Sequence, residues 1–388
     1  MKQALLLTIL FAGFAACSMP RGPVPLSGDA PEAKGWELET VLDSLNYPWS
    51  MVWLHESSDT LLISEKPGRL RVAVDGELQP RVVSGLPELY VSGQGGLLDL
   101  SLHPDFEENR LLYFTYSTGD EDANRTTVGR GELHGYTLQN TEEIFRVDSD
   151  KTDDQHFGSR MVWLDDSTFL LSVGDGGNYI RYEGEWIREQ AQNKKSHFGS
   201  ILRITEQGDA PDDNPFADDT ESAPELWTYG HRNVQGLAYD GATGRVWANE
   251  HGSRGGDELN LLEPGGNYGW PRATYSREYH YTRISDETSL PGMVDPKIVW
   301  TPTQAPSGLA IYSGDKFPEW QGDLFSGSLV GEQVRRINLD GEDVAGEESI
   351  PVGRRVRDVK QGPDGNLYLL TDHENGELMR IVPGADVQ

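Results

Sequence analysis

The sequence is poor in cysteine, in basic residues and in long apolar runs. Cys17 is the only cysteine among 388 residues, so no disulfide can form within the chain. Lys and Arg number 33 against 63 Asp and Glu, which gives a net charge of −30, and no basic cluster appears. Nucleic-acid binding needs such clusters opposite the phosphates and is therefore excluded. The acidity itself indicates a well-solvated surface.

One largely apolar run, Ala4 to Ala16, follows Lys2 near the N-terminus. Its thirteen residues are too few to span a bilayer and are typical of an export signal. The run ends in Gly-Phe-Ala-Ala before Cys17, which resembles the end of a bacterial lipoprotein signal. Residues 1–17 are therefore predicted to be a signal peptide, with Cys17 lipidated as the first mature residue.

The alternative is an ordinary secretory signal that is cleaved near Ala16. With a lipid, we expect a periplasmic protein that touches the outer membrane only through this anchor. Without one, we expect a soluble periplasmic or secreted protein, and in either case a monomer or a homodimer. Residues 18–35 are rich in Pro, Gly and Ser, which predicts a tether.

The rest of the chain repeats one pattern six times: a short apolar strand, a turn with Asp, Asn or Gly, and a second apolar strand. Met161-Val-Trp-Leu followed by Phe169-Leu-Leu-Ser is one example. The first strands of the units begin at residues 51, 97, 161, 236, 308 and 359. Such repeats are typical of propellers whose blades are four-stranded sheets. The sequence therefore predicts an all-β fold, a six-bladed β-propeller of four-stranded antiparallel blades.

We expect residues 36–388 to form this single propeller domain. Trp36 to Val41 could pair with Glu377 to Val382, which would close the ring and remove both free edges. Longer loops are expected around residues 120–155, 176–200 and 271–300. In a propeller such loops tend to gather on one face and build a functional rim, although they could also be decorative.

His156 is the first candidate for catalysis, because it lies immediately before the first strand of the third unit. Asp175 follows the second strand of the same unit, on a turn that should return near His156. An imidazole beside a carboxylate can take a proton near neutral pH and stabilise the resulting charge. Spacing alone leaves the alternative open that the Asp175 loop is merely a Gly-rich turn.

Cations and amides occupy the equivalent position in three other units. The residues that precede or flank the first strands there are Gln94, Arg232, Asn233, Arg355 and Arg357. Three arginines that converge in an acidic protein indicate an anionic ligand with several carboxylates, because guanidinium groups bind carboxylates with two hydrogen bonds. The alternative is that each arginine pairs with one of the many Asp and Glu side chains.

Hard oxygen ligands appear without a His or Cys cluster. Asp257, Glu258 and Tyr268 are the candidates, and the loop Glu250 to Ser253 could add backbone carbonyls. This combination favours Ca²⁺ over zinc. No EF-hand loop is present, so the calcium prediction is weak without other support.

The chain resembles the soluble pyrroloquinoline quinone (PQQ)-dependent sugar dehydrogenases, in particular the bacterial aldose sugar dehydrogenases. The resemblance extends from about Asn46 to Val382. It rests on motifs that occur in this order: Gly93-Gln-Gly-Gly-Leu-Leu98, His103-Pro-Asp-Phe106, the His156 motif, Val173-Gly-Asp175, His197-Phe-Gly-Ser-Ile-Leu-Arg203, Gly230-His-Arg-Asn233, Glu250-His-Gly252 to Trp270, Trp300-Thr-Pro, Ala305-Pro-Ser-Gly308 and Arg355-Val-Arg-Asp358.

The resemblance implies a six-bladed propeller that oxidises the anomeric carbon of an aldose to a lactone and passes the electrons to an external acceptor. It implies that His156 is the general base and that Asp175 tunes it. Calcium would be held partly by the carbonyls of Gly252 and Ser253, and a second, structural calcium would lie at Glu258 and Tyr268. The residues implied to hold or enclose PQQ are Gln94, Arg232, Asn233, Trp300, Arg355 and Arg357.

Two positions depart from the glucose-type enzymes. Val330 stands in Ser328-Leu-Val-Gly331 where those enzymes have a cofactor-contacting Lys, and Gln155 replaces a sugar-contacting Asp before the base. The chain thus lacks one cation that would contact the cofactor, and the substrate preference of the glucose-type enzymes cannot be assumed for it. The rival predictions are a non-catalytic propeller that binds a sugar or a protein, and more distantly a calcium-dependent lactonase.

Overall fold

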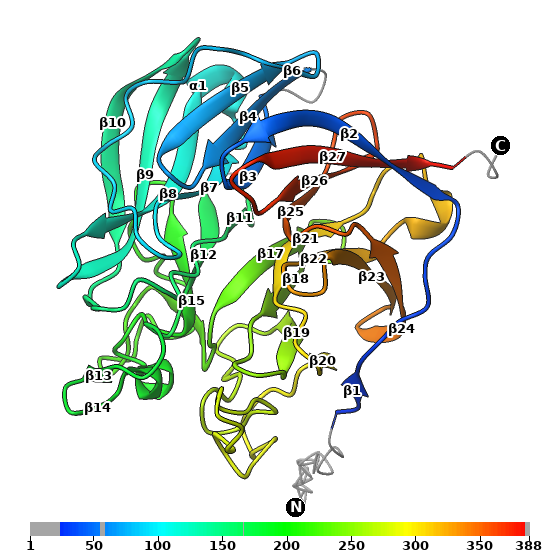
Figure 1. Cartoon of the computed structure of the whole chain (residues 1–388). Helices are drawn as coiled ribbons and strands as arrows, with labels where there is room; N and C mark the ends of the chain where they lie inside the picture. Colours follow the sequence, from blue (N-terminus) through cyan, green and yellow to red (C-terminus); the bar gives the residue numbers. More distant parts are fainter. Residues whose placement is uncertain (1–23, 55–58, 166, 385–388) are drawn as a thin grey trace, which may run out of the picture.

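The structure is a computed structural model that describes residues 24–54, 59–165 and 167–384. Six blades of four antiparallel strands each surround one axis, and one of the blades is extended by a fifth strand. The innermost strands β3, β7, β11, β17, β21 and β25 gather near the centre of Figure 1, and each contacts the next in ring order. The predicted six-bladed β-propeller is therefore confirmed.

Each blade is a meander whose strands run outward from the axis. The first three blades are β3 (Pro48–Trp53), β4 (Thr60–Glu65), β5 (Arg69–Val74) and β6 (Glu77–Leu78); β7 (Leu97–Leu102), β8 (Leu111–Gly119), β9 (Asn124–His134) and β10 (Thr137–Arg146); β11 (Met161–Trp163), β12 (Thr168–Val173), β15 (Ser200–Thr205) and β16 (Leu226–Tyr229). The next two are β17 (Val234–Asp240), β18 (Arg245–Glu250), β19 (Asp257–Leu262) and β20 (Ile298–Trp300); β21 (Pro306–Ile311), β22 (Leu324–Ser328), β23 (Gln333–Asp340) and β24 (Asp343–Pro351).

The sixth blade joins the two ends of the described chain. It contains β25 (Val356–Gln361), β26 (Leu367–Thr371), β27 (Gly376–Pro383) and, as the outermost strand, β2 (Trp36–Leu45). The predicted closure is confirmed, because Trp36 pairs with Pro383 and Thr40 with Met379. The remaining elements are β1 (Leu26–Ser27), α1 (Phe106–Asn109), the hairpin β13 (Arg181–Tyr182) and β14 (Glu185–Trp186), and the 3-10 helices η1 (Ile187–Gln192) and η2 (Pro318–Trp320).

Apolar clusters between neighbouring blades form the core. The second strands of the blades are continuous apolar runs that are buried on both faces, as in β12, so each blade packs against the blade on either side. One cluster joins blades 2 and 3 through Tyr113 and Phe169, and another joins blades 5 and 6 through Phe325 and Val359. The many aromatic residues of the sequence are thus used mainly between blades.

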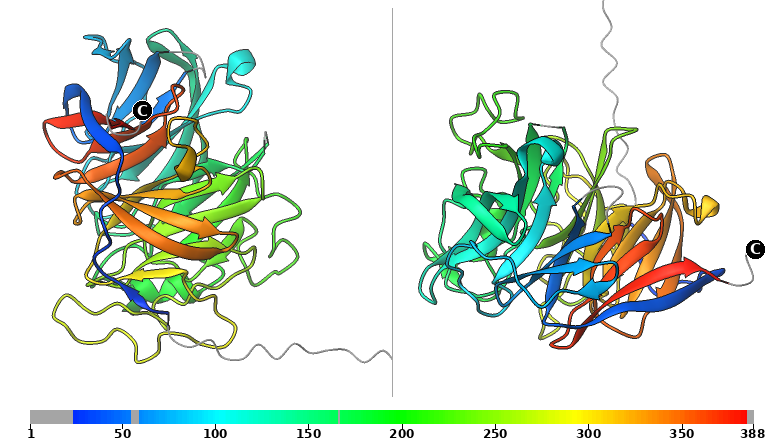
Figure 2. Two further views of the ribbon diagram at one scale, coloured as in Figure 1. Left: turned by 90° about the vertical axis from the view of Figure 1, so that its right-hand side faces the viewer. Right: turned by 90° about the horizontal axis from the view of Figure 1, so that it is seen from above.

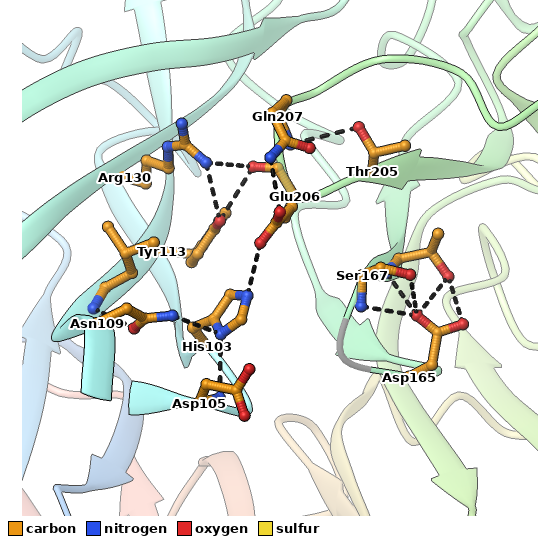
Figure 3. Close-up of polar contacts among 12 residues, drawn as sticks. His103, Asp105, Asn109, Tyr113, Arg130, Asp165, Ser167, Thr205, Glu206 and Gln207 are labelled. Atoms are coloured by element: carbon orange, nitrogen blue, oxygen red, sulfur yellow. Dashed lines mark hydrogen bonds and ion pairs between the residues drawn. The ribbon is translucent and has the colours of Figure 1, made fainter. Parts of the chain in front are cut away.

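A polar network also links blades 2 and 3 (Figure 3). Nδ1 of His103 accepts the backbone N–H of Asp105 at 3.0 Å, so its proton must lie on Nε2, which faces a carboxylate oxygen of Glu206 at 2.8 Å. Tyr113 and Arg130 both donate to the Glu206 carbonyl, at 3.0 and 2.7 Å. The His103 motif therefore has a structural role between the blades.

The axis of the ring is filled by a buried ion triad. Arg160 lies 3.1 Å from Asp99 of blade 2 and 3.1 Å from Asp358 of blade 6. Asp99 also accepts hydrogen bonds from Ser50 and from the Met161 backbone N–H, at 2.6 and 2.8 Å. All three charged side chains are buried, so the triad ties three blades together at the centre.

The described part of the predicted tether, residues 24–35, lies along the outside of the propeller. Leu26 and Ser27 pair in parallel with Val299 and Trp300, so β1 becomes a fifth strand of blade 4. Further along, Ala33 donates its backbone N–H to the Ser349 carbonyl of blade 5 at 2.8 Å. The tether prediction is therefore wrong for residues 24–35, because the open edge of β20 offers backbone partners that composition does not reveal.

Residues 18–23 and the predicted signal peptide with Cys17 lie outside the described residues. Within the described ranges, no helix has the length and hydropathy that crossing a membrane requires.

Two of the long loops project from the same end of the molecule. The β13–β14 hairpin with η1 and the loop of residues 271–297 both lie at the lower end of Figure 1, and the left view of Figure 2 shows the second loop at the bottom of the molecule. An ion pair of 2.7 Å between Arg188 and Glu278 connects them. The expectation that insertions gather on one side holds for these two loops.

Candidate active site

His156 and Asp175 lie side by side, as the sequence predicts. Because β11 and β12 are antiparallel, the loop before β11 and the turn after β12 meet at one end of blade 3. His156 Nδ1 lies 2.6 Å from an Asp175 carboxylate oxygen, and both side chains are buried. The loop passes so close that a Cβ on Gly174 would lie 2.0 Å from the His156 carbonyl oxygen, so only glycine fits there.

The Asp175 carboxylate is fixed by two further hydrogen bonds. Trp270 donates its indole N–H to it at 2.8 Å, and the Gly177 backbone N–H donates at 3.2 Å. Burial favours the neutral acid, but the nearby His156 and Arg232 hold the pKa of Asp175 below its usual value. The carboxylate is therefore ionised and accepts the Nδ1 proton of His156.

The other ring nitrogen of His156 is consequently the free base. Burial, together with the charge of Arg232, lowers the pKa of His156 in spite of the favourable Asp175 carboxylate. The imidazole is thus neutral near pH 7, with its proton on Nδ1 and its lone pair on Nε2. The amide nitrogen of Asn178 lies 3.3 Å from Nε2 and marks the direction in which this lone pair points.

A cavity of about 280 Å³ opens at the centre of the ring next to this pair. One wall is apolar and consists of Trp49, Leu98 and Phe157, which pack against one another. Gln94 links the cavity to the base, because it lines the cavity and accepts the backbone N–H of His156 at 2.9 Å. A flat ligand with polar edges would find both an apolar surface and hydrogen-bonding partners here.

The charged lining of this cavity is mainly cationic. Arg355, Arg357 and Lys66 line it, and Asp372 is the only carboxylate among its described lining residues. Both arginines share Asp372 at 3.1 Å, and although burial opposes ionisation, the two guanidinium groups lower the pKa of Asp372 to about 2. In a chain with a net charge of −30, this local excess of positive charge indicates an anionic ligand.

The positive charges at the cavity also affect a second histidine, His251. His251 lines the cavity, and its Nε2 lies 2.8 Å from the Pro306 carbonyl oxygen. Burial, followed by the charges of Arg232 and Arg357, lowers the pKa of His251 to about 3. His251 is therefore neutral and, because a carbonyl only accepts, it must be the donor in this contact.

Arg232 and Asn233 support the base and are not among the described residues that line the cavity. Arg232 donates to the side-chain oxygen of Asn178 at 3.0 Å, and it orients the amide that faces His156. Asn233 accepts the backbone N–H of Gly158 at 3.2 Å, which holds the loop that carries the base. Of the residues expected to contact a cofactor, Gln94, Arg355 and Arg357 line the cavity.

Two of the predicted residues lie elsewhere. Trp300 is buried between blades 4 and 5, donates its indole N–H to Glu347 at 2.7 Å, and is not among the described residues that line the cavity. It lies on a strand that is buried on all sides, and its side chain points into the contact between blades. Val330 is 53% exposed and is absent from the described lining, although its neighbour Leu329 belongs to it.

Lys66, Asp372 and His251 are cavity residues that sequence reasoning missed. They share a position with Asp175, because each follows the second strand of its blade. Lys66 follows β4 and donates from Nζ to the Gly93 carbonyl at 2.7 Å. A search of the residues after every second strand, as well as those before every first strand, would have found them.

The predicted calcium ligands beside the cavity are engaged by an arginine. The guanidinium of Arg232 donates to the carbonyls of His251 and Gly252, at 3.2 and 2.5 Å. Ser253 has its backbone N–H on the Ser276 hydroxyl at 3.2 Å. A cation that bound to the Gly252 carbonyl would compete with the charge of Arg232, while the Ser253 carbonyl stays a predicted ligand.

Glu258 has surroundings that suit a cation better. It faces Glu250 across the pair β18 and β19, and the amide of Asn260 donates to both carboxylates, at 3.1 and 3.3 Å. Burial and the charge of Glu250 raise the pKa of Glu258 well above its usual value. A cation or a proton would relieve this repulsion. However, the described residues contain no group of three or more His, Cys, Asp or Glu residues arranged to hold a metal.

Tyr268 lies near these carboxylates, but its hydroxyl is already occupied. The hydroxyl donates to the Leu261 carbonyl at 2.9 Å and accepts the Glu263 backbone N–H at 2.7 Å. Its ring stacks on His231 at 4.6 Å, and His231 in turn contacts Glu250 at 2.8 Å. The side chain of Tyr268 therefore supports the Glu250 region, and its hydroxyl does not point to a metal.

Comparison with known proteins agrees with this geometry. The family model described as glucose / sorbosone dehydrogenase matches residues 45–380. The chain is 50% identical to an uncharacterized protein of Synechocystis sp. over 95% of this chain and 92% of that protein. It is 36% identical to the aldose sugar dehydrogenase YliI of Escherichia coli, over 89% of this chain and 92% of that protein.

Solved structures show the same architecture. The soluble aldose sugar dehydrogenase from Escherichia coli in its apo form superposes with a TM-score of 0.84 at 35% identity, over 90% of this chain and 100% of that one. The PQQ-bound form of an aldose sugar dehydrogenase from Streptomyces coelicolor superposes with a TM-score of 0.70 at 26% identity, over 91% of this chain and 100% of that one.

Proposed function

Because the chain belongs to the glucose / sorbosone dehydrogenase family, we propose that it is a PQQ-dependent dehydrogenase that oxidises aldose sugars at the anomeric carbon to lactones and passes the electrons to an external acceptor. The observation that carries this proposal is the contact of 2.6 Å between His156 and Asp175 at the edge of a cationic cavity. A platform that only binds sugar has no need of a neutral, oriented imidazole.

The lining of the cavity fits PQQ, which carries three carboxylates on a flat aromatic core. Arg355, Arg357 and Lys66 supply three cations against the single carboxylate of Asp372. Trp49 and Phe157 supply an apolar surface for the ring system. Lys66 also offers a cation in place of the one that is lost at Val330. When bound, PQQ supplies the acceptor for the hydride that leaves the sugar C1 as the lactone forms.

The residues of the chain provide the proton chemistry. Nε2 of His156 accepts the proton of the anomeric hydroxyl, and the ionised Asp175 stabilises the imidazolium that results. Trp270 and the Gly177 backbone N–H hold this carboxylate in place, so that it need not reorganise during the reaction. Burial, together with the charge of Arg232, lowers the pKa of His156 and keeps the imidazole neutral before the sugar binds, so the base is available at neutral pH.

We propose calcium only as a structural ion at Glu258. The pair of buried carboxylates, Glu250 and Glu258, supports a bound cation there. Beside the cavity, the carbonyl of Gly252 already accepts a hydrogen bond from Arg232, so no step of the reaction is assigned to calcium.

We also propose that the chain is exported and that Cys17 carries a lipid. The support is the signal-like run before Cys17. Labelling of cells with a palmitate analogue should mark the wild-type protein and leave Cys17→Ser unmarked. A wild-type protein that is cleaved but unlabelled would instead be a soluble exported protein.

The proposed activity is tested by adding PQQ to the purified apoprotein, following the quinone absorbance, and then adding aldoses. We expect saturable PQQ binding and bleaching by aldoses. His156→Ala should retain binding and lose the bleaching, because it removes the base but none of the cavity cations. Binding without bleaching in the wild type would favour a non-catalytic propeller, and the absence of binding at micromolar PQQ would refute the proposal.

A further inference from the structure

Lys151 is a buried lysine that has no part in the proton chemistry described above. It lies in the loop between β10 and β11, shortly before the base, and is only 4% exposed. Its backbone pairs with that of Asn124 at the start of β9, through hydrogen bonds of 2.9 and 3.0 Å. The side chain is thus fixed at its root by blade 2, while its ammonium group reaches the loop that carries His156.

The ammonium group contacts the chain on both sides of the base. On the N-terminal side it donates to the Asp153 carbonyl at 2.5 Å. On the C-terminal side it lies over the Phe157 ring, 3.6 Å from the ring centroid, in a cation–π contact. Phe157 directly follows His156 and forms part of the apolar wall of the cationic cavity. One charged group therefore holds both flanks of the base.

Asp153 extends this support to the groups around Nε2 of the base. Its carboxylate accepts the backbone N–H of Gln155 at 3.1 Å and that of Asn178 at 3.0 Å. Gln155 immediately precedes the base, and the Asn178 amide lies 3.3 Å from Nε2. The carboxylate is also packed against the turn after β12, because a Cβ on Gly177 would lie 2.5 Å from one of its oxygens. A displacement of Asp153 would therefore disturb the surroundings of Nε2.

The backbone of the base needs such support. His156 has a φ of 52°, in the left-handed region that residues other than glycine seldom adopt. A residue keeps such a conformation only where its surroundings hold it there. Gln94 binds the His156 backbone N–H at 2.9 Å, and the Thr126 hydroxyl donates to the Phe157 carbonyl at 2.7 Å. The contacts of Lys151 complete this set on the side of Asp153 and behind the Phe157 ring.

The stability of the fold does not explain a charge at this position. Burial lowers the pKa of Lys151 to about 7, although the carboxylates of Asp153, Asp154 and Asp175 favour the charged form. The ammonium is therefore costly to the folded protein at neutral pH, and a neutral side chain of similar length would fill the same space without this cost. What the charge adds is the pair of contacts that flank the base.

We propose that Lys151 is a positioning residue, whose ammonium group holds Asp153 and Phe157 and thereby fixes the backbone of His156 and the direction of its Nε2. This role rests on the proposed function, because the direction of Nε2 matters only if His156 takes a proton from a substrate. The same contacts hold the Phe157 ring in the wall of the cationic cavity.

The first test uses the apoprotein and depends neither on PQQ nor on turnover. Hydrogen exchange is followed by mass spectrometry in wild type and Lys151→Met. We expect the amides of Gln155 and Asn178 to exchange at least about tenfold faster in the variant, with no change in β12 and with a melting temperature that is unchanged or higher. The matched control is Lys360→Met, which removes a half-buried lysine in blade 6 and should alter neither amide.

The second test measures the PQQ-loaded protein with an aldose. In Lys151→Met, kcat should fall about tenfold or more while KM stays within about threefold, because a misdirected base affects proton transfer more than sugar binding. Lys151→Arg keeps a cation with N–H donors and should recover part of kcat. A loss of kcat that arose only from a damaged fold would lower the melting temperature as well.

Each outcome decides between the alternatives. Unchanged exchange at Gln155 and Asn178, or unchanged kcat in Lys151→Met, would overturn the positioning role. A melting temperature far below that of the wild type would show that Lys151 serves the fold, which would also overturn it. Faster exchange in the variant of a protein that neither binds PQQ nor oxidises aldoses would support the hold on the loop and refute only the dehydrogenase.

Discussion

The substitution Lys66→Met tests whether the cavity holds an anion with the charges that its lining provides. The side chain lines the cavity and is half-buried, and its ammonium group contacts two neutral partners, the Gly93 carbonyl at 2.7 Å and the Tyr47 ring at 5.2 Å. Burial lowers the pKa of Lys66, which means that its charge is costly in the empty cavity. A carboxylate on the ligand would recover part of this cost, and a hydrogen bond between charged groups is worth roughly 2 kcal/mol, or about thirtyfold in affinity.

The assay is a titration of PQQ into apoprotein, with melting of the apoprotein as the second readout. We expect Lys66→Met to weaken PQQ binding by about thirtyfold while the melting temperature of the apoprotein stays the same or rises. Lys360→Met is the matched control, because Lys360 is similarly half-buried but is not among the described lining residues. A dissociation constant for Lys66→Met within twofold of that of the control would refute the reasoning.

Three further predictions follow from buried charges. Because the pKa of His156 is lowered, kcat/KM should stay high down to about pH 6.5 and fall only below it; an acid limb centred above pH 7 would contradict this. Burial lowers the pKa of Lys151 to about 7, so between about pH 7 and 10 the unfolded chain binds more protons than the folded one. In denaturant titrations, the unfolding free energy of the wild type should therefore rise with pH by a few kcal/mol relative to that of Lys151→Met. Glu258→Gln should raise the melting temperature in EDTA and remove any increase caused by Ca²⁺; the same Ca²⁺ response in both proteins would place the ion elsewhere.

The fold could be predicted because the strands and turns of each unit are recognisable from its local sequence. The apolar runs of the second strands mark buried strands, and the six starts fix the number of blades. The pairing of His156 with Asp175 could also be expected, because both belong to one blade and antiparallel neighbours bring the two turns together. The arginines were recognisable for the same reason, since they recur at equivalent positions.

The other site residues could not be assigned because their placement depends on contacts between blades. Trp300 ends the last strand of blade 4 and Arg355 precedes the first strand of blade 6, but the indole lies in the interface of blades 4 and 5 while the guanidinium pairs with Asp372. In the sequence, Lys66 is a lysine before a Pro-Gly turn, without a feature that marks it as a site residue. Only the closed ring brings it to the same cavity as the arginines. The composition of residues 24–35 likewise suggests a flexible segment, and only the structure shows that the edge of β20 offers it backbone partners.

The path of residues 24–35 has a consequence for where a substrate can come from. The Val24 backbone N–H donates to the hydroxyl of Tyr275 at 2.8 Å, and Tyr275 belongs to the loop whose Glu278 pairs with Arg188. Cys17 stands seven residues before Val24, a stretch that can extend to at most about 25 Å. A lipid on Cys17 would therefore keep this loop close to the bilayer surface. A substrate that enters beside this loop would then approach along the bilayer surface.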